Sequence, residues 1–189
     1  MGLMLETFRL KNFKAIRDSG EVRLMPLTAL IGYNGVGKSN LLDGLQTFRE
    51  TVVSGLDHAL SRWGGYEYVL NPASQLAERR NGRSYQIEPI EFMFTGTAIE
   101  GGQYEASMTI GRNPDANRLY IEHEQLHLRG KKLVVERNNA GQIVYGNQVL
   151  STVGLSPGMS MFSPFPMAPR SLSGINVTYI EAAPPARSA

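Results

Sequence analysis

The chain contains 189 residues, of which 42% are hydrophobic and 19% charged, and its formal net charge is +2. This length suits one domain or slightly more, and the composition is typical of a globular protein with a substantial core. So small a net charge gives no argument for a nucleic acid or membrane partner. No run approaches the roughly 20 apolar residues of a membrane-spanning helix, and the lack of cysteine excludes disulfides and thiolate metal sites.

The amino-terminal residues predict both a location and a strand. Glu6, Arg9 and Lys11 interrupt the first apolar residues, which is atypical of a secretory signal. We therefore expect a soluble, cytoplasmic protein with no membrane partner. Residues 3–13 alternate their side chains in the way that predicts a β-strand.

A short apolar run, LTALI at residues 27–31, leads into a glycine-rich loop and predicts a strand buried on both faces. After the loop, apolar residues recur at spacings of three and four as far as Leu60, which predicts a helix. Gly44 should weaken this helix locally, and Gly55 should bend or divide it.

The remainder of the chain predicts an antiparallel sheet and then an irregular segment. Residues 62–84 are rich in Gly, Asn, Pro and Arg and predict irregular surface chain with a short helical turn. Residues 85–145 form successive alternating runs, whose short connections NPDAN and NNAGQ suit hairpins rather than crossover helices. Residues 155–174 contain four prolines, whereas INVTYIEA at 175–182 predicts one more strand.

The loop GYNGVGKSN occupies residues 32–40 and matches the pattern G-x-x-x-x-G-K-[ST]. Glycines let the backbone turn tightly enough for several N–H groups to contact a polyphosphate, and the following helix adds its positive N-terminal end. Lys38 should contact the β- and γ-phosphates, and the Ser39 hydroxyl should bind Mg²⁺. A glycine-rich turn with a solvated lysine is the alternative. The residues predicted to bind ATP are Gly32, Tyr33, Asn34, Gly35, Val36, Gly37, Lys38, Ser39 and Asn40.

Together with LKNFKAI at residues 10–16, this loop resembles the amino-terminal part of the RecF/SMC/OLD-like ATPases. These are ABC-type P-loop ATPases, often described as AAA-family predicted ATPases. Asn34 and Asn40 match the two asparagines of that family's G-x-N-G-x-G-K-S-N loop, and Asn12-Phe13-Lys14 match its aromatic-basic start. The resemblance is specific over residues 5–48 and rests on layout alone as far as about residue 146.

The resemblance implies an α/β (α+β) fold, the first lobe of an ABC/SMC-like P-loop ATPase, with a large antiparallel sheet beside the P-loop strand and helix. Residues 1–150 would form this lobe, with the antiparallel part at about 84–146. Residues 151–189 would be a Pro/Met/Ser-rich segment and a final strand leading toward a second lobe. A nucleotide kinase usually begins with its phosphate loop and alternates strands with helices, so it fits this layout less well.

In this family the second lobe carries a signature motif, a Walker B Asp-Glu pair and a switch histidine, none of which is clear in this chain. SLSGI at 171–175 is only faintly similar to the signature, and Glu181 lacks a preceding aspartate. Gln148, or less suitably Gln125, could be the family's Q-loop glutamine, although either could equally be an exposed turn residue. We therefore expect hydrolysis to require a second lobe or partner subunit in a nucleotide-dependent dimer, in DNA repair, chromosome maintenance or phage defence.

The histidines and the basic residues leave alternatives open. His123 and His127 are four residues apart, which is a metal-binding spacing on a helix, but on the predicted strand they would share a solvated face. Seven basic residues could form a DNA-binding rim at hairpin ends or could be scattered solubilising charges. They are Arg79, Arg80, Arg83, Arg112, Arg118, Lys131 and Lys132.

Two other functions use other segments of the chain. The Met/Phe/Pro-rich residues 157–169 would expose apolar groups, which suits a non-hydrolysing module that binds a protein partner in response to nucleotide. The arginine cluster AERRNGR at 77–83 could serve a small-molecule kinase as a lid, and an exposed loop is the plainer interpretation.

Overall fold

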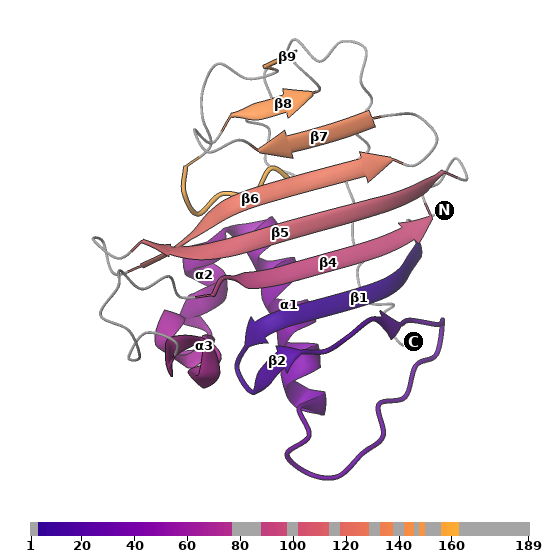
Figure 1. The fold of residues 1–189 in the computed structure, drawn as a ribbon, viewed down its shortest axis with the longest axis vertical. Helices are drawn as coiled ribbons and strands as arrows, with labels where there is room; N and C mark the ends of the chain where they lie inside the picture. Colours follow the sequence, from indigo (N-terminus) through magenta and orange to yellow (C-terminus); the bar gives the residue numbers. More distant parts are fainter. Residues whose placement is uncertain are drawn as a thin grey trace, which may run out of the picture.

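The computed structural model describes residues 4–76, 88–97, 102–113, 118–128, 133–137, 142–145, 148–149 and 156–162. Among these residues one antiparallel sheet of nine strands is covered on one face by helices α1 and α2 (Figure 1). The amino-terminal elements are β1 (Met4–Phe13), β2 (Ile16–Asp18), β3 (Val22–Arg23), α1 (Lys38–Ser54), α2 (Leu56–Ser61), a 3₁₀ helix (Tyr66–Tyr68) and α3 (Pro72–Leu76). The later strands are β4 (Ile90–Thr97), β5 (Gln103–Asn113), β6 (Arg118–Leu128), β7 (Leu133–Arg137), β8 (Ile143–Tyr145) and β9 (Gln148–Val149).

The sheet has the strand order β2-β1-β4-β5-β6-β7-β8-β9, and β3 also pairs with β1. The antiparallel strands predicted between residues 85 and 145 are confirmed, because each pairs with its neighbour in the chain. The sheet extends beyond that range, since Phe8 of β1 lies opposite Phe94 of β4. The predicted first strand is therefore confirmed, and it belongs to the same sheet.

The core lies between the inner face of the sheet and α1. Phe8 and Leu10 of β1 and Phe92 of β4 are fully buried, as the alternation of the strands requires. Phe48 of α1 completes an aromatic cluster, with its ring centroid 4.2 Å from that of Phe94. Each such side chain contributes about 1.5–3 kcal/mol by leaving water, so this cluster fixes α1 on the sheet.

The predicted helix is confirmed, and so is its division at Gly55. Gly55 has a φ of 88°, and its N–H donates to Thr51 O at 3.0 Å, which ends α1 before α2 begins. Gly44 has a packing role that the sequence did not reveal. A Cβ at Gly44 would lie 2.3 Å from Leu10 Cδ2, so only glycine lets α1 approach β1 this closely.

The prediction of a buried strand at residues 27–31 is wrong. These residues form no strand, and the exposed fractions of Leu27 and Ile31 are 90% and 92%. Pairing with β1 ends where Leu24 N–H donates to Glu6 O at 2.8 Å. A strand buried on both faces needs a neighbouring strand, and no described strand lies beside residues 27–31.

Residues 62–76 are more ordered than the predicted irregular surface chain. Val69 is fully buried, and its carbonyl accepts a hydrogen bond from Lys14 N–H at 2.8 Å. Asn71 donates from Nδ2 to Lys14 O at 2.7 Å and from its backbone N–H to Asn12 O at 3.1 Å. These bonds stabilise Asn12 and Lys14 at positive φ angles of 57° and 48°, so the segment buttresses the turn after β1.

Residues 156–162 pack on the inner side of the sheet. Leu56 N–H donates to Gly158 O at 2.8 Å, and Ile121 N–H donates to Pro157 O at 2.8 Å. Phe162 packs against the core, so the prediction that the 157–169 segment exposes its apolar groups is wrong for Phe162. Residues 163–169 lie outside the described structure. Among the described helices, none combines the length and apolarity needed to cross a bilayer.

Candidate nucleotide-binding loop

The glycine-rich loop lies at one end of the molecule, between β3 and the start of α1 (Figure 1). Residues 32–36 are exposed, and Gly37 and Lys38 are half-buried. Gly35 and Gly37 have φ angles of 86° and 95°, which residues other than glycine rarely adopt. These angles turn the backbone sharply into α1 and leave an exposed loop in front of the helix.

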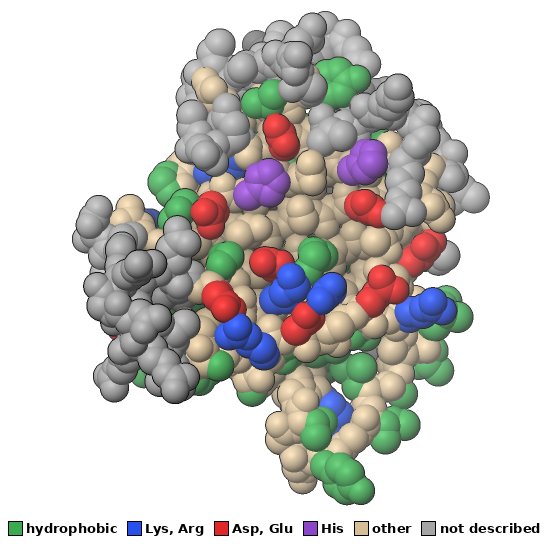
Figure 2. Space-filling view, in the orientation of Figure 1, with side chains coloured by type: hydrophobic (Ala, Val, Ile, Leu, Met, Phe, Trp, Pro, Cys, Tyr) green, Lys and Arg blue, Asp and Glu red, His purple; other side chains and the backbone are tan. Residues whose placement is uncertain are grey.

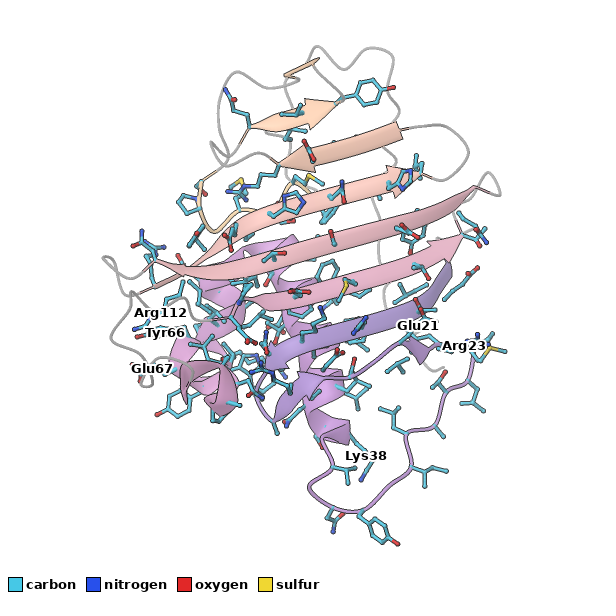
Figure 3. All side chains as sticks on the ribbon, in the orientation of Figure 1. Glu21, Arg23, Lys38, Tyr66, Glu67 and Arg112 are labelled. Carbon is cyan, nitrogen blue, oxygen red and sulfur yellow. The ribbon has the colours of Figure 1, made fainter. Side chains whose placement is uncertain are left out.

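The loop curls around the side chain of Lys38. Its Nζ donates to Gly32 O at 2.6 Å and to Tyr33 O at 2.7 Å. Figure 3 shows Lys38 at the start of α1, apart from the labelled pair Glu21 and Arg23. These two bonds use two of the three donors of the ammonium group, so one donor is left for an anion bound at the loop.

The first turn of α1 offers unpaired donors. Helix hydrogen bonding begins with Leu41 N–H, which donates to Gly37 O at 2.9 Å. The N-cap residue is Gly37, which has no side chain to cap the helix, and the first turn carries no acidic residue. A helix of 17 residues carries a partial positive charge at this end. The absence of a cap leaves this end free to bind an anion.

The residues present fit a magnesium-bound nucleotide. The backbone N–H groups of Gly35 and of residues 37–39, together with the ammonium of Lys38, would hold the phosphates, whereas Val36 N–H donates to Tyr33 O at 3.5 Å. Ser39 is exposed at the helix start, where its hydroxyl would contribute one oxygen ligand to Mg²⁺. Mg²⁺-ATP would supply the transferable phosphoryl group.

Neighbouring elements hold α1 in place. Lys14 Nζ donates to Asp43 Oδ2 at 2.8 Å and lies 3.3 Å from the centroid of the Trp63 ring. Trp63 in turn donates from Nε1 to Thr47 Oγ1 at 2.8 Å. The turn after β1 is therefore tied to both the second and the third turns of α1. In the sequence, only the aromatic-basic motif Asn12-Phe13-Lys14 pointed to this contact.

Neither glutamine proposed for the Q-loop lies on a strand that pairs with β1, the strand against which α1 packs. Gln125 is in β6, which is separated from β1 by β4 and β5. Gln148 is in β9, at the opposite edge of the sheet from β2. The assignment of a Q-loop residue stays a prediction.

His123 and His127 lie on strand β6, as predicted. His127 Nδ1 is 3.9 Å from Glu105 Oε2, and both side chains are about 40% exposed. Within the described residues, no group of three or more His, Asp and Glu side chains could hold a metal ion. SLSGI at 171–175 and Glu181 lie outside the described residues.

The sequence analysis did not predict the buried ion pair between Glu124 and Arg137. The pairing of β5 with β6 shifts by one residue between Thr109 and Ile110, which makes Glu122 the extra residue of a β-bulge in β6. Because of this bulge, the side chain of Glu124 faces the core. Glu124 is fully buried beside Arg137, with Oε2 3.5 Å from Nη1, and it accepts hydrogen bonds from Ser160 Oγ and from Met161 N–H. Burial raises the pKa of Glu124 despite these donors. Without the bulge, regular alternation would have placed both Glu122 and Glu124 on the outer face of the sheet.

Of the seven basic residues considered for DNA binding, the structure describes only Arg112 and Arg118, which lie at the same end of the β5–β6 pair. Arg118 pairs with Asp57 at 2.8 Å, and the Arg112 guanidinium lies 5.8 Å from the Tyr66 ring centroid. The other candidates, including the arginine cluster at 77–83, lie outside the described residues. The outer face of the sheet interleaves Lys and Arg with Asp and Glu (Figure 2), as in the pair Lys11–Glu91 at 2.8 Å. DNA binding stays a prediction.

Comparison with known proteins adds no relative. No family model matches the chain, and no curated protein matches its sequence. The functional argument therefore rests on the loop itself.

Proposed function

We propose that this chain is the nucleotide-binding first lobe of a RecF/SMC/OLD-like P-loop ATPase, with Mg²⁺-ATP bound at residues 32–40. The observation that carries the proposal is the loop around Lys38. Its ammonium is held by Gly32 O and Tyr33 O at the uncapped start of α1. A pattern match alone could be coincidental, but here the Lys38 ammonium donates two hydrogen bonds to the backbone of the loop, which a lysine extended into solvent would not do.

Hydrolysis would require groups from a second lobe or a partner subunit. No Asp-Glu pair follows an apolar strand in the sequence, and the resemblance places that pair in the second lobe. The work in DNA repair, chromosome maintenance or phage defence follows from the resemblance alone.

The test is calorimetric titration of the full chain with Mg²⁺-ATP, with phosphate release followed in the same samples. Lys38→Ala should weaken binding at least tenfold, because it removes the one ammonium group enclosed by the loop. The matched control is Lys11→Ala on the outer face of the sheet, which should leave binding unchanged. Ser39→Ala should weaken the Mg²⁺ dependence of binding more than the affinity for ATP without metal. Equal affinities for the wild type and Lys38→Ala would exclude this loop as the site.

A second function, a non-hydrolysing module that contacts a protein partner in response to nucleotide, is favoured by one observation. Tyr33 and Val36, within the loop itself, are 89% and 60% exposed. Apolar side chains at a nucleotide site suit a partner that senses its occupancy. The two functions differ in turnover, since phosphate release after addition of a second-lobe fragment would exclude the non-hydrolysing module.

A further inference from the structure

Residues 156–162, which we call the strap, contact β6 and α2 without belonging to a helix or a strand (Figure 1). On one edge of β6, β7 pairs only with Glu124–Leu128, and no other described strand lies beside the first half of that edge. There Ile121 N–H donates to Pro157 O at 2.8 Å. Leu56 N–H, at the start of α2, donates to Gly158 O at 2.8 Å. The strap therefore bridges the sheet and the second helix.

Arg137 holds the strap by its backbone. The guanidinium donates from Nη1 to Met159 O at 2.6 Å and from Nη2 to Ser156 O at 3.0 Å. The side chain of Arg137 is only 3% exposed, so these carbonyl oxygens stand where water would otherwise solvate the charge. Removal of the strap would return the guanidinium to water.

Glu124 holds the following residues of the strap. Its carboxylate is fully buried and accepts hydrogen bonds from Ser160 Oγ and Met161 N–H. Ser160 is itself buried, whereas Phe162 is the one strap side chain that packs against the hydrophobic core. Polar bonds to two buried charged groups are therefore the main attachment of the strap, and apolar burial is the smaller part.

Such an attachment is finely balanced. Withdrawing two charged groups from water costs free energy that their attraction and hydrogen bonds offset only in part. Burial raises the pKa of Glu124 despite its donors, which is the sign expected of that cost. When the strap moves away, Glu124 and Arg137 regain water, while β6 keeps its pairing with β5 and β7. An open arrangement thus recovers hydration that global unfolding is not needed to provide.

We propose that the strap opens as one unit from β6 and α2 while the sheet stays folded, and that Glu124 and Arg137 control how often it opens. Opening exposes the edge of β6 at Ile121, where unpaired backbone groups can accept an added strand. It also frees Leu56 N–H at the start of α2. Neither consequence involves the glycine loop, which precedes the other end of α1, so the inference does not depend on nucleotide binding.

Hydrogen exchange of individual amides tests the proposal, followed by NMR on the full chain without nucleotide. The reporters are the N–H groups of Leu56, Ile121 and Met161, which the closed strap protects. Corrected for intrinsic exchange, all three should give the same equilibrium constant of opening. That constant should be at least tenfold larger than the constants of the amides that pair β4 with β5.

Ser160→Ala should raise the opening constant of the three reporters about tenfold or more, because it removes a hydrogen bond to a charged group. The amides between β4 and β5 should change much less. Ser156→Ala is the matched control within the strap, since Ser156 is exposed and it is the carbonyl that Arg137 contacts. This control should leave the opening constant unchanged.

Reporter constants equal to those of the β4–β5 amides would overturn the proposal, because the strap would then open only with the whole fold. Different constants for Leu56 and Ile121 would overturn opening as one unit. Equal effects of Ser160→Ala and Ser156→Ala would show that Glu124 does not control the strap.

Discussion

At the residue scale, two positions show how a single side chain determines local structure. Gly44 lets α1 approach Leu10, and Glu124 fixes residues 160–161 against β6. Arg137 extends this contact by donating from Nη1 to Met159 O at 2.6 Å and from Nη2 to Ser156 O at 3.0 Å. Both positions contradict a simple expectation, since glycine usually weakens a helix and glutamate usually lies on a surface.

Gly44→Ala should destabilise the protein by about 1–2 kcal/mol. The gain of up to about 1 kcal/mol in helix propensity is outweighed by overpacking, which costs about 1–3 kcal/mol, because Leu10 is fully buried and has no free space to enter. Urea denaturation measures the change. Arg49→Ala on the exposed side of α1 is the control and should change stability by less than about 0.5 kcal/mol. A more stable Gly44→Ala variant would contradict the close approach of α1 to β1.

Glu124 should make the stability pH-dependent. Its pKa is raised above 4.5 in the folded state by burial, so the folded protein binds more protons than the unfolded chain as the pH rises above that value. The free energy of unfolding therefore falls with rising pH across this window. Arg137 is the charged group that faces it, and Ser160 and Met161 contribute neutral donors.

Urea denaturation of the wild type and Glu124→Gln between pH 4.5 and neutrality measures this dependence. The stability of the wild type relative to the variant should decrease as the pH rises. A relative stability that increased with pH would mean that the Arg137 ion pair and the hydrogen bonds outweigh the cost of burial.

At the element scale, the position of α1 depends on the turn after β1. Lys14 forms an ion pair with Asp43 and a cation–π contact with the Trp63 ring, and its side chain is 17% exposed. This is a better-shielded contact than the pair Arg17–Glu88, in which both side chains are over 40% exposed. Shielded pairs with a cation–π contact contribute more than solvated ones.

Lys14→Met should therefore lower stability by about 1–2 kcal/mol, since it removes the ion pair and the cation–π contact and keeps much of the aliphatic side chain. It should also speed hydrogen exchange in the first two turns of α1. Arg17→Met is the matched control and should change stability by less than about 0.5 kcal/mol. Similar effects of the two substitutions would show that Lys14 does not hold α1.

At the scale of the whole molecule, the glycine loop lies outside the densely packed region. The sheet and helices bury their apolar residues together, whereas residues 25–36 contribute five of the eight large apolar side chains that are exposed in the described part of the chain. Lys38→Ala should therefore leave the thermal unfolding temperature unchanged, which is why it can test binding separately from folding.

The sequence alone determined β1, the antiparallel strands from β4 to β8, helix α1, its end at Gly55, and the glycine-rich loop that precedes α1. Each of these depends on local properties, namely alternation, helical spacing or the backbone freedom of glycine. Only the tertiary structure decided three other matters: the exposure of residues 27–31, the packing role of Gly44, and the buried Glu124–Arg137 pair. Exposure depends on whether another strand is present. Close approach and burial depend on residues distant in the chain, and a one-residue bulge reverses which face a side chain occupies.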